Sequence, residues 1–170
     1  MARHRRRSRR ARPAAALLGL RLANPEIVAG QTVLDFASGS GLAAIAAALA
    51  GAATVTAADI DPYASAAIGL NAALNGVSVE VTSGDIIGST GPWDVVLAGD
   101  ICYERPLADR VTAWLRGLSE AGVTVLLGDP GRTYLPKEGL EWLVRYAVKT
   151  TRELEDTDVR NAVVWRFTLS

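Results

Sequence analysis

The stretch at residues 32–50, TVLDFASGSGLAAIAAALA, constrains the fold more than any other part of the chain. A short apolar segment, interrupted by Asp35, leads into a turn of five small residues at 37–41. Apolar residues then recur at helical spacing, at Leu42, Ile45 and Leu49. This pattern predicts a strand, a tight glycine turn and a helix. Because glycine lacks a Cβ atom, a nucleotide-like ligand can approach the turn and meet the free N–H groups of the new helix.

Strand-like and helix-like segments alternate along the rest of the chain. Further strands are predicted at 53–58, 77–82, 93–98, 123–127, 149–154 and 163–169. Helices are predicted at 13–23, 62–74, 106–118 and 137–147. Strands that alternate with helices favour a parallel sheet, and the last two strands, with no helix between them, are expected to pair antiparallel. We therefore predict an α/β, Rossmann-like fold with a mostly parallel seven-stranded sheet, an antiparallel C-terminal hairpin and helices on both faces.

The composition and charge divide the chain into two unequal parts. Its 170 residues, 49% of them hydrophobic, fit one domain, which we assign to 24–170. Seven of the 18 basic residues lie in the first twelve positions, and residues 1–23 are expected to be an Arg-rich, disordered segment. A transit peptide or a twin-arginine export signal is the alternative for this segment. After position 12 the chain has 11 basic and 18 acidic residues, and this net charge of about −7 argues against nucleic acid as a partner.

Other classes of protein are excluded by what the sequence lacks. No apolar run approaches the roughly 20 residues that span a membrane, so no membrane partner is expected. The single cysteine, Cys102, and the single histidine, His4, exclude an internal disulfide and a Cys/His zinc cluster, so no metal site is predicted. A reducing, cytoplasmic location fits best.

Aspartates end five of the predicted strands. In an open α/β sheet, ligands bind beyond the carboxyl ends of the strands, where these side chains should gather. Like charges repel at such an edge unless a ligand that is cationic or rich in hydroxyl groups lies between them. The five aspartates are Asp35, Asp59, Asp85, Asp100 and Asp129.

The glycine turn alone leaves the ligand ambiguous. Residues 39–44 match GxGxxA, and Asp59 follows Gly39 by twenty residues, as in dinucleotide-binding proteins. However, Asp35 would repel a pyrophosphate, and the chain lacks a second mononucleotide-binding half. S-adenosyl-L-methionine, which carries an adenosine, no phosphate and a positive centre, fits better. Asp59 is then predicted to hold the ribose hydroxyls, Asp85 the adenine amino group, and Asp35 to lie near the ammonium group.

The order of these motifs resembles the class I S-adenosylmethionine-dependent methyltransferases. The matching segments are VLDFASGSG, AADIDPYA, NAALNG, SGDI and WDVVLAGDICYE. Within the class, DICY at 100–103 resembles the Asp-x-x-Tyr/Phe motif of the family-16 protein methyltransferases. GDPGRTYLP at 128–136 is similar to the branch that methylates lysines of the electron transfer flavoprotein β-subunit.

The resemblance implies a role for each matching residue. The implied catalytic residues are Asp100 and Tyr103. Asp129 and Arg132 are implied to contact a protein substrate, such as that β-subunit. The implied cofactor-binding residues are Asp35, Ala37, Gly39, Gly41, Asp59, Asp85 and Ile86. Ala37 replaces the first glycine of the family pattern. The family's tryptophan-containing segment before the first strand has no counterpart, because all four tryptophans come later.

The implied reaction is the attack of a neutral lysine amine on a sulfonium methyl group. A lysine with a pKa of about 10.4 must first lose a proton, and a carboxylate with a pKa of about 3.9 is too weak a base to hold it. Asp100 is therefore expected to orient the amine while the proton passes to water, and Tyr103 to flank the lysine stem. The alternatives are methylation of a small amine or a ribosomal protein, a nucleotide-binding oxidoreductase fragment, and a non-catalytic adaptor.

Overall fold

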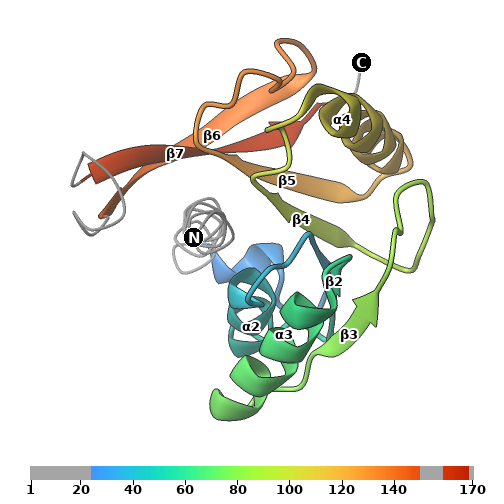
Figure 1. The fold of residues 1–170 in the computed structure, drawn as a ribbon, viewed down its shortest axis with the longest axis vertical. Coiled ribbons are helices and arrows are strands. Elements are labelled where there is room, and N and C mark those ends of the chain that lie inside the picture. Colours follow the sequence, from blue (N-terminus) through green and yellow to red (C-terminus); the bar gives the residue numbers. More distant parts are fainter. Residues whose placement is uncertain (1–23, 150–158, 169–170) are drawn as a thin grey trace.

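The computed structural model describes residues 24–149 and 159–168, which form a single twisted sheet with helices packed on it (Figure 1). After a short 3-10 helix at Pro25–Ile27, the strands are β1 (Thr32–Phe36), β2 (Thr54–Asp59), β3 (Glu80–Ser83), β4 (Val95–Gly99), β5 (Thr124–Asp129), β6 (Leu140–Lys149) and β7 (Val159–Phe167). The helices are α2 (Leu42–Leu49), α3 (Pro62–Leu74) and α4 (Arg105–Glu120).

The seven strands lie in the order β3-β2-β1-β4-β5-β7-β6. The first five are parallel, whereas β7 runs antiparallel to both β5 and β6. The chain moves from β1 to β2 and β3 on one side, and then returns to place β4 on the other side of β1. The strand order therefore reverses between β1 and β4, which is where open α/β sheets bind ligands. The predicted architecture, including the antiparallel C-terminal hairpin, is confirmed.

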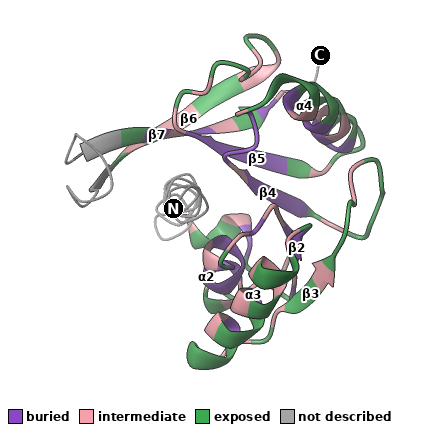
Figure 2. Cartoon of the chain, in the orientation of Figure 1, coloured by how far each residue is buried: buried purple, intermediate pink, exposed green. Residues whose placement is uncertain are grey.

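The helices cover both faces of the sheet, as predicted. Helices α2 and α3 lie together on one face, where Ala44, Ala47 and Ile68 pack against residues of the sheet such as Val33 and Leu97. Helix α4 covers the other face with a buried stripe at Ala108, Val111, Leu115 and Leu118. Figure 2 shows that β4 and β5, between these layers, are almost entirely buried. Burial on both faces explains the continuous apolar runs of these two parallel strands, VVLA at 95–98 and VLL at 125–127.

Local sequence signals set the ends of α3. The side chain of Asp61 accepts a hydrogen bond from the N–H of Tyr63 at 2.9 Å, and Pro62 occupies the first helical position. This N-cap is the one that the Asp-Pro pair predicts. Gly76, with a φ of 66°, follows the helix and supports the predicted left-handed stop.

The predicted helix at 137–147 is wrong, because strand β6 occupies this region. Gly139 has a φ of 73°, which a right-handed helix does not accommodate, and residues 140–148 alternate Leu, Trp, Val, Tyr and Val with other side chains. The strand pairs with β7 along its length, with a register shift between Trp142 and Val144. The apolar residues Leu140, Leu143, Val144 and Ala147 also recur at helical spacing, so the pattern alone does not distinguish a strand from a helix.

Other differences concern where elements begin and end. Strand β3 is shorter than the predicted 77–82, and β7 begins four residues before the predicted 163. Of the predicted strand at 149–154, Lys149 ends β6 and the rest lies outside the described residues. The helix predicted at 13–23 and the segment assigned at 1–23 also lie outside them. Within the described residues, no helix is long and apolar enough to cross a membrane.

Candidate active site

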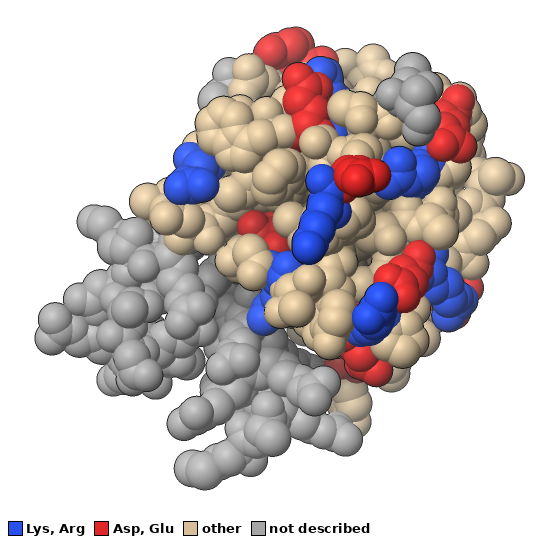
Figure 3. Space-filling view, turned by 90° about the horizontal axis from the view of Figure 1, so that it is seen from above, with Lys and Arg blue, Asp and Glu red and all other residues tan. Residues whose placement is uncertain are grey.

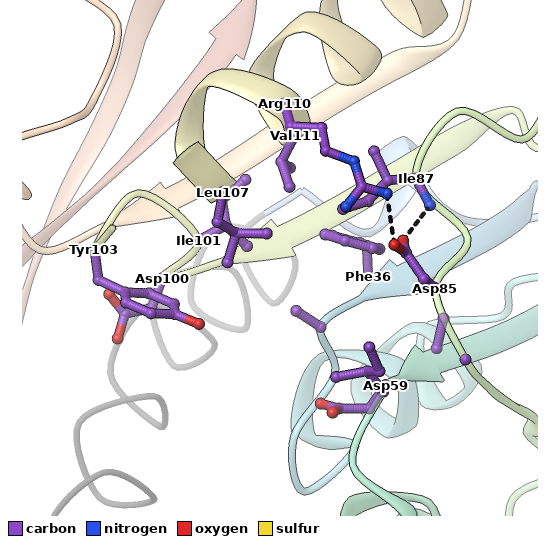
Figure 4. Close-up of a pocket in the computed structure, with 14 residues that line it drawn as sticks. Phe36, Asp59, Asp85, Ile87, Asp100, Ile101, Tyr103, Leu107, Arg110 and Val111 are labelled. Carbon is purple, nitrogen blue, oxygen red and sulfur yellow. Dashed lines mark hydrogen bonds and ion pairs between the residues drawn. The ribbon is translucent and has the colours of Figure 1, made fainter. Parts of the chain in front are cut away.

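A pocket opens at the carboxyl ends of β1, β2, β3 and β4, beside the N-terminal half of α4. It encloses about 680 Å³ of empty space, counting the solvent at its mouth. Figure 4 shows the carboxylates of Asp59 and Asp85 on one side, and Asp100 with Tyr103 at the far end. The lining residues are Phe36, Ala37, Ala58, Asp59, Ile60, Gly84, Asp85, Ile87, Asp100, Ile101, Tyr103, Leu107, Arg110 and Val111. Three predicted aspartates thus surround one cavity, as expected from the sheet topology.

Asp59 joins the glycine turn to the end of β2. Its carboxylate accepts hydrogen bonds from the backbone N–H of Gly39 at 2.8 Å and of Asp61 at 3.0 Å. A carboxylate has about four acceptor positions, so two backbone donors leave capacity for two further donors such as hydroxyl groups. A Cβ atom placed on Gly39 would meet no atom within 4 Å, so the space over the turn is open. By contrast, a Cβ on Gly41 would meet Ile68 at 3.2 Å, so that glycine permits close packing of α3.

Asp35 lies behind the turn and does not line the pocket. Its buried Oδ2 atom accepts hydrogen bonds from the Ser38 hydroxyl at 2.5 Å and from the Ala44 N–H at 3.0 Å. Ala44 is in the first turn of α2, whose N-cap residue, Gly41, has no side chain to cap the helix. Asp35 therefore caps α2 from the preceding strand. The helix N-terminus that receives a pyrophosphate in dinucleotide-binding folds already faces a carboxylate of the protein.

Asp85 pairs with an arginine that the sequence did not single out. Its Oδ2 atom accepts a hydrogen bond from Arg110 of α4 at 2.5 Å, and Oδ1 accepts from the N–H of Ile87 at 3.0 Å (Figure 4). The bond from Arg110, followed by the one from Ile87, lowers the pKa of Asp85. The predicted residue Ile86 and its neighbour Ile87 both pack against the hydrophobic cluster under α4, and of the two only Ile87 lines the pocket.

Asp100 is held in an unusual conformation at the end of β4. Its φ is 55°, in the left-handed region, and its side chain is 2% exposed. Arg132 donates to both of its carboxylate oxygens, from Nε to Oδ1 at 2.6 Å and from Nη2 to Oδ2 at 2.8 Å. The structure therefore brings Asp100, Tyr103 and Arg132 together, although Arg132 itself does not line the pocket.

Asp129 is fully buried at the end of β5 and does not line the pocket. Its Oδ1 atom accepts from the N–H groups of Gly131 at 2.7 Å and Arg132 at 2.6 Å, whereas Oδ2 has no hydrogen-bond partner. Burial is the main reason that the pKa of Asp129 is raised. Direct contact of this side chain with a protein substrate has no support in this geometry. Its visible role is to shape the turn that carries Arg132.

The sequence prediction did not include the apolar residues that line the pocket, although the sequence contains a signal for them. An isoleucine follows the aspartate at the ends of three strands, as Asp-Ile at 59–60, 85–86 and 100–101. Ile60 and Ile101 of these pairs line the pocket, together with Phe36 and Leu107. The repeated pair could have indicated an apolar slot bordered by acids. Arg110 could not have been found this way, because it belongs to a helix that approaches the slot from outside.

Known proteins resemble this chain in sequence. The chain is 39% identical over 159 residues to the electron transfer flavoprotein beta subunit lysine methyltransferase of Xenopus laevis, and the match covers 89% of this chain. It spans 65% of the length of that relative.

Solved structures share the fold. Thermoplasma acidophilum 1320 superposes with a TM-score of 0.70 at 19% identity, covering 91% of this chain and 87% of that one. The magnesium protoporphyrin IX methyltransferase of Synechocystis with bound S-adenosylhomocysteine superposes with a TM-score of 0.66 at 16% identity, covering 92% and 81%. The fold is that of the class I methyltransferases. The sequence model of the family described as ribosomal protein L11 methyltransferase (PrmA) matches residues 16–125. The chain therefore belongs to the PrmA family of methyltransferases.

Proposed function

We propose that this chain binds S-adenosyl-L-methionine in the pocket and transfers its methyl group to lysine side chains of a protein. The charge of the pocket carries this proposal. Three carboxylates and one guanidinium line it, and Asp35 caps the helix that would otherwise receive a phosphate. Such a lining favours a cationic ligand with hydroxyl groups over a dinucleotide. The oxidoreductase alternative has no comparable support.

The residues present fit this cofactor. Asp59 retains acceptor positions for two ribose hydroxyls, and the open space over Gly39 admits a ligand close to the backbone. The apolar side chains of Ile60, Ile101 and Leu107 offer flat contact to an adenine ring. Asp85 stays the predicted partner of the adenine amino group, and its Arg110 pair limits the directions from which it can accept.

The cofactor would supply an electrophilic methyl group on a positively charged sulfur. The protein must then present a neutral amine in line with that group, and most of the acceleration is expected from this positioning. Asp100 lines the pocket, and we expect its carboxylate to accept a hydrogen bond from the amine. Tyr103 lies beside it in Figure 4 and would flank the alkyl stem of the lysine.

The electron transfer flavoprotein β-subunit is the first candidate substrate. The similarity to the lysine methyltransferase of Xenopus laevis covers 89% of this chain and includes the GDPGR segment that holds Arg132. The family model stops at residue 125, before this segment. Ribosomal protein L11 is the second candidate, because the family is described by that substrate.

Surface charge fits a protein substrate better than a polyanion. Acidic and basic side chains alternate over the face shown in Figure 3. On β6 and β7, Arg166 pairs with Glu141 at 2.6 Å, and on α4 Arg105 lies 3.8 Å from Asp109.

The test is methyl transfer by the purified chain. It is incubated with S-adenosylmethionine and either the recombinant β-subunit or recombinant ribosomal protein L11, and each product is digested and read by mass spectrometry. We expect the β-subunit to gain the mass of one or more methyl groups on lysine. Asp100→Asn should reduce the rate by about 100-fold or more, in the range of losses seen when a transition-state contact is removed. Modification of L11 alone would favour the second candidate, and modification of neither would contradict the proposal.

A further inference from the structure

Arg132 holds the carboxylate of Asp100 from the side that faces away from the pocket. Two parallel hydrogen bonds join the guanidinium to both carboxylate oxygens, at 2.6 and 2.8 Å. Asp100 lines the pocket, whereas Arg132 does not, so the guanidinium approaches the carboxylate from outside the cavity. A fork of this kind fixes the plane of the carboxylate and leaves one acceptor position on each oxygen.

The loop after β5 is built to place Arg132 there. Strands β4 and β5 are paired in register, with Gly99 opposite Gly128, so Asp100 and Asp129 follow at equivalent points of adjacent strands. The Oδ1 atom of Asp129 accepts from the N–H groups of Gly131 and Arg132, and Gly131 has a φ of 91°, in the left-handed region. This turn brings Arg132 back over the end of β4.

The pair also has an electrostatic consequence. Asp100 and Asp129 are buried carboxylates on neighbouring strands, and the charge of Asp100 adds to the burial that raises the pKa of Asp129. An unpaired carboxylate beside a lysine would stabilise the ammonium form of that lysine, which cannot attack a methyl group. A guanidinium on the same carboxylate opposes this effect, because it repels the second positive charge.

We propose that Arg132 is a positioning residue for Asp100, which fixes the orientation of this acceptor and makes the lysine amine bound beside it easier to deprotonate. The inference rests on the proposed function and gives Arg132 a task other than direct contact with the protein substrate. Asp129 and Gly131 act through it, by forming the turn from which the guanidinium extends.

Several other titratable or charged groups face the same region. Cys102, two residues after Asp100, is buried, and its pKa is raised to about 12, so it stays a neutral thiol. Among the residues that the structure describes, Asp59, Asp85, Tyr103 and Arg110 line the pocket with Asp100, and Asp129 lies on the adjacent strand. They are unchanged in every variant below, so a difference between pH profiles isolates the contribution of Arg132.

The test compares the pH dependence of kcat for lysine methylation of the β-subunit in the wild type, R132Q, R132K and R166Q. Arg166 pairs with Glu141 away from the pocket and serves as the matched control for loss of a paired arginine. We expect R132Q to move the midpoint of the rate rise toward higher pH by about one pH unit and to lower kcat by about tenfold or more. R132K should keep the wild-type midpoint but have a reduced kcat, because an ammonium group retains the charge without the planar fork. R166Q should match the wild type.

The outcomes separate the inference from the proposed function. If the wild type is active and the rate of R132Q rises with the same pH midpoint as the wild type, Arg132 does not act on the amine and the inference is wrong. If R132Q fails to fold, the kinetics of R132K test the inference. A reduced kcat with an unchanged KM in R132K supports Arg132 as a positioning residue, and wild-type kinetics in R132K contradict it. A wild type that binds S-adenosylhomocysteine but methylates no lysine would overturn the proposed function, and the inference with it.

Discussion

The carboxylate of Asp59 accepts a hydrogen bond from the backbone N–H of Gly39, 2.8 Å away and twenty residues earlier in the chain. This bond joins the end of β2 to the glycine turn that follows β1, the two segments expected to hold a nucleoside. The same carboxylate accepts from the N–H of Asp61, which caps α3. One side chain therefore connects two segments that are expected to bind the ligand, and it retains acceptor positions of its own.

Asp59→Ala should abolish most of the stabilisation by S-adenosylhomocysteine. At about 100 times its Kd, a ligand stabilises the folded state by about 2.7 kcal/mol, which corresponds to a rise in Tm of roughly 5–10 °C for a chain of this size. The measurement is a thermal shift with and without the ligand. Asp61→Ala is the control, because it removes only an N-cap worth about 1 kcal/mol and should leave the ligand-induced rise unchanged. Equal rises in both variants would contradict the assignment of Asp59.

Asp35→Ala should lower the free energy of unfolding of the protein in the absence of ligand. The substitution removes the acceptor for the Ala44 N–H and the Ser38 hydroxyl in a buried place, and each unsatisfied group costs about 1–3 kcal/mol. Urea unfolding monitored by circular dichroism measures this loss. Asp35→Asn keeps an acceptor oxygen and should lose less. If both variants unfold at the wild-type urea concentration, Asp35 does not cap α2.

Cys102 should be inert toward thiol reagents in the folded protein. It is fully buried, and its pKa is raised to about 12, mainly by burial and to a smaller extent by the charges of Asp129 and Asp100. The thiolate is the reactive form, so at pH 8 labelling by Ellman's reagent should be slower by about 100-fold or more than in guanidinium chloride. Rapid labelling of the native protein would show that this side of the site opens.

The buried carboxyl group of Asp129 should make stability depend on pH. Its pKa is higher in the folded state than its ordinary value of 3.8, so the folded state holds this proton more tightly than the unfolded state. The contribution of Asp129 to the free energy of unfolding therefore falls as pH rises from about 4 through the raised folded value, and is constant above it.

The matched variant for this effect is Asp129→Asn, which keeps an oxygen for the two N–H donors but cannot ionise. Its stability relative to the wild type should increase with pH across that window, as measured by urea unfolding between about pH 4 and 8. A difference that does not change with pH would show that Asp129 has the same affinity for its proton in both states.

The sequence by itself determined the features that depend on neighbouring residues. The Asp61-Pro62 start of α3, the stop near Gly76 and the turn at 37–41 all follow from local backbone preferences, which is why they could be predicted. The aspartates at the ends of β2 and β4 were predictable for a related reason, since parallel strands bring their carboxyl ends to one edge.

The tertiary structure alone decided which of these aspartates face the pocket and what they bind. Asp35 and Asp129 look like the others in sequence, yet they lie away from the cavity. Asp35 caps α2, and Asp129 accepts from the turn after β5. The pairing of Asp100 with Arg132, 32 residues later, depends on the contact between β4 and β5 and on the turn after β5.

The choice between helix and strand at β6 also depends on the tertiary structure. The spacing of its apolar residues fits a helix as well as a strand, and long-range pairing with β7 settles the choice. Local preferences amount to a fraction of a kcal/mol per residue, so a full set of hydrogen bonds to a neighbouring strand outweighs them.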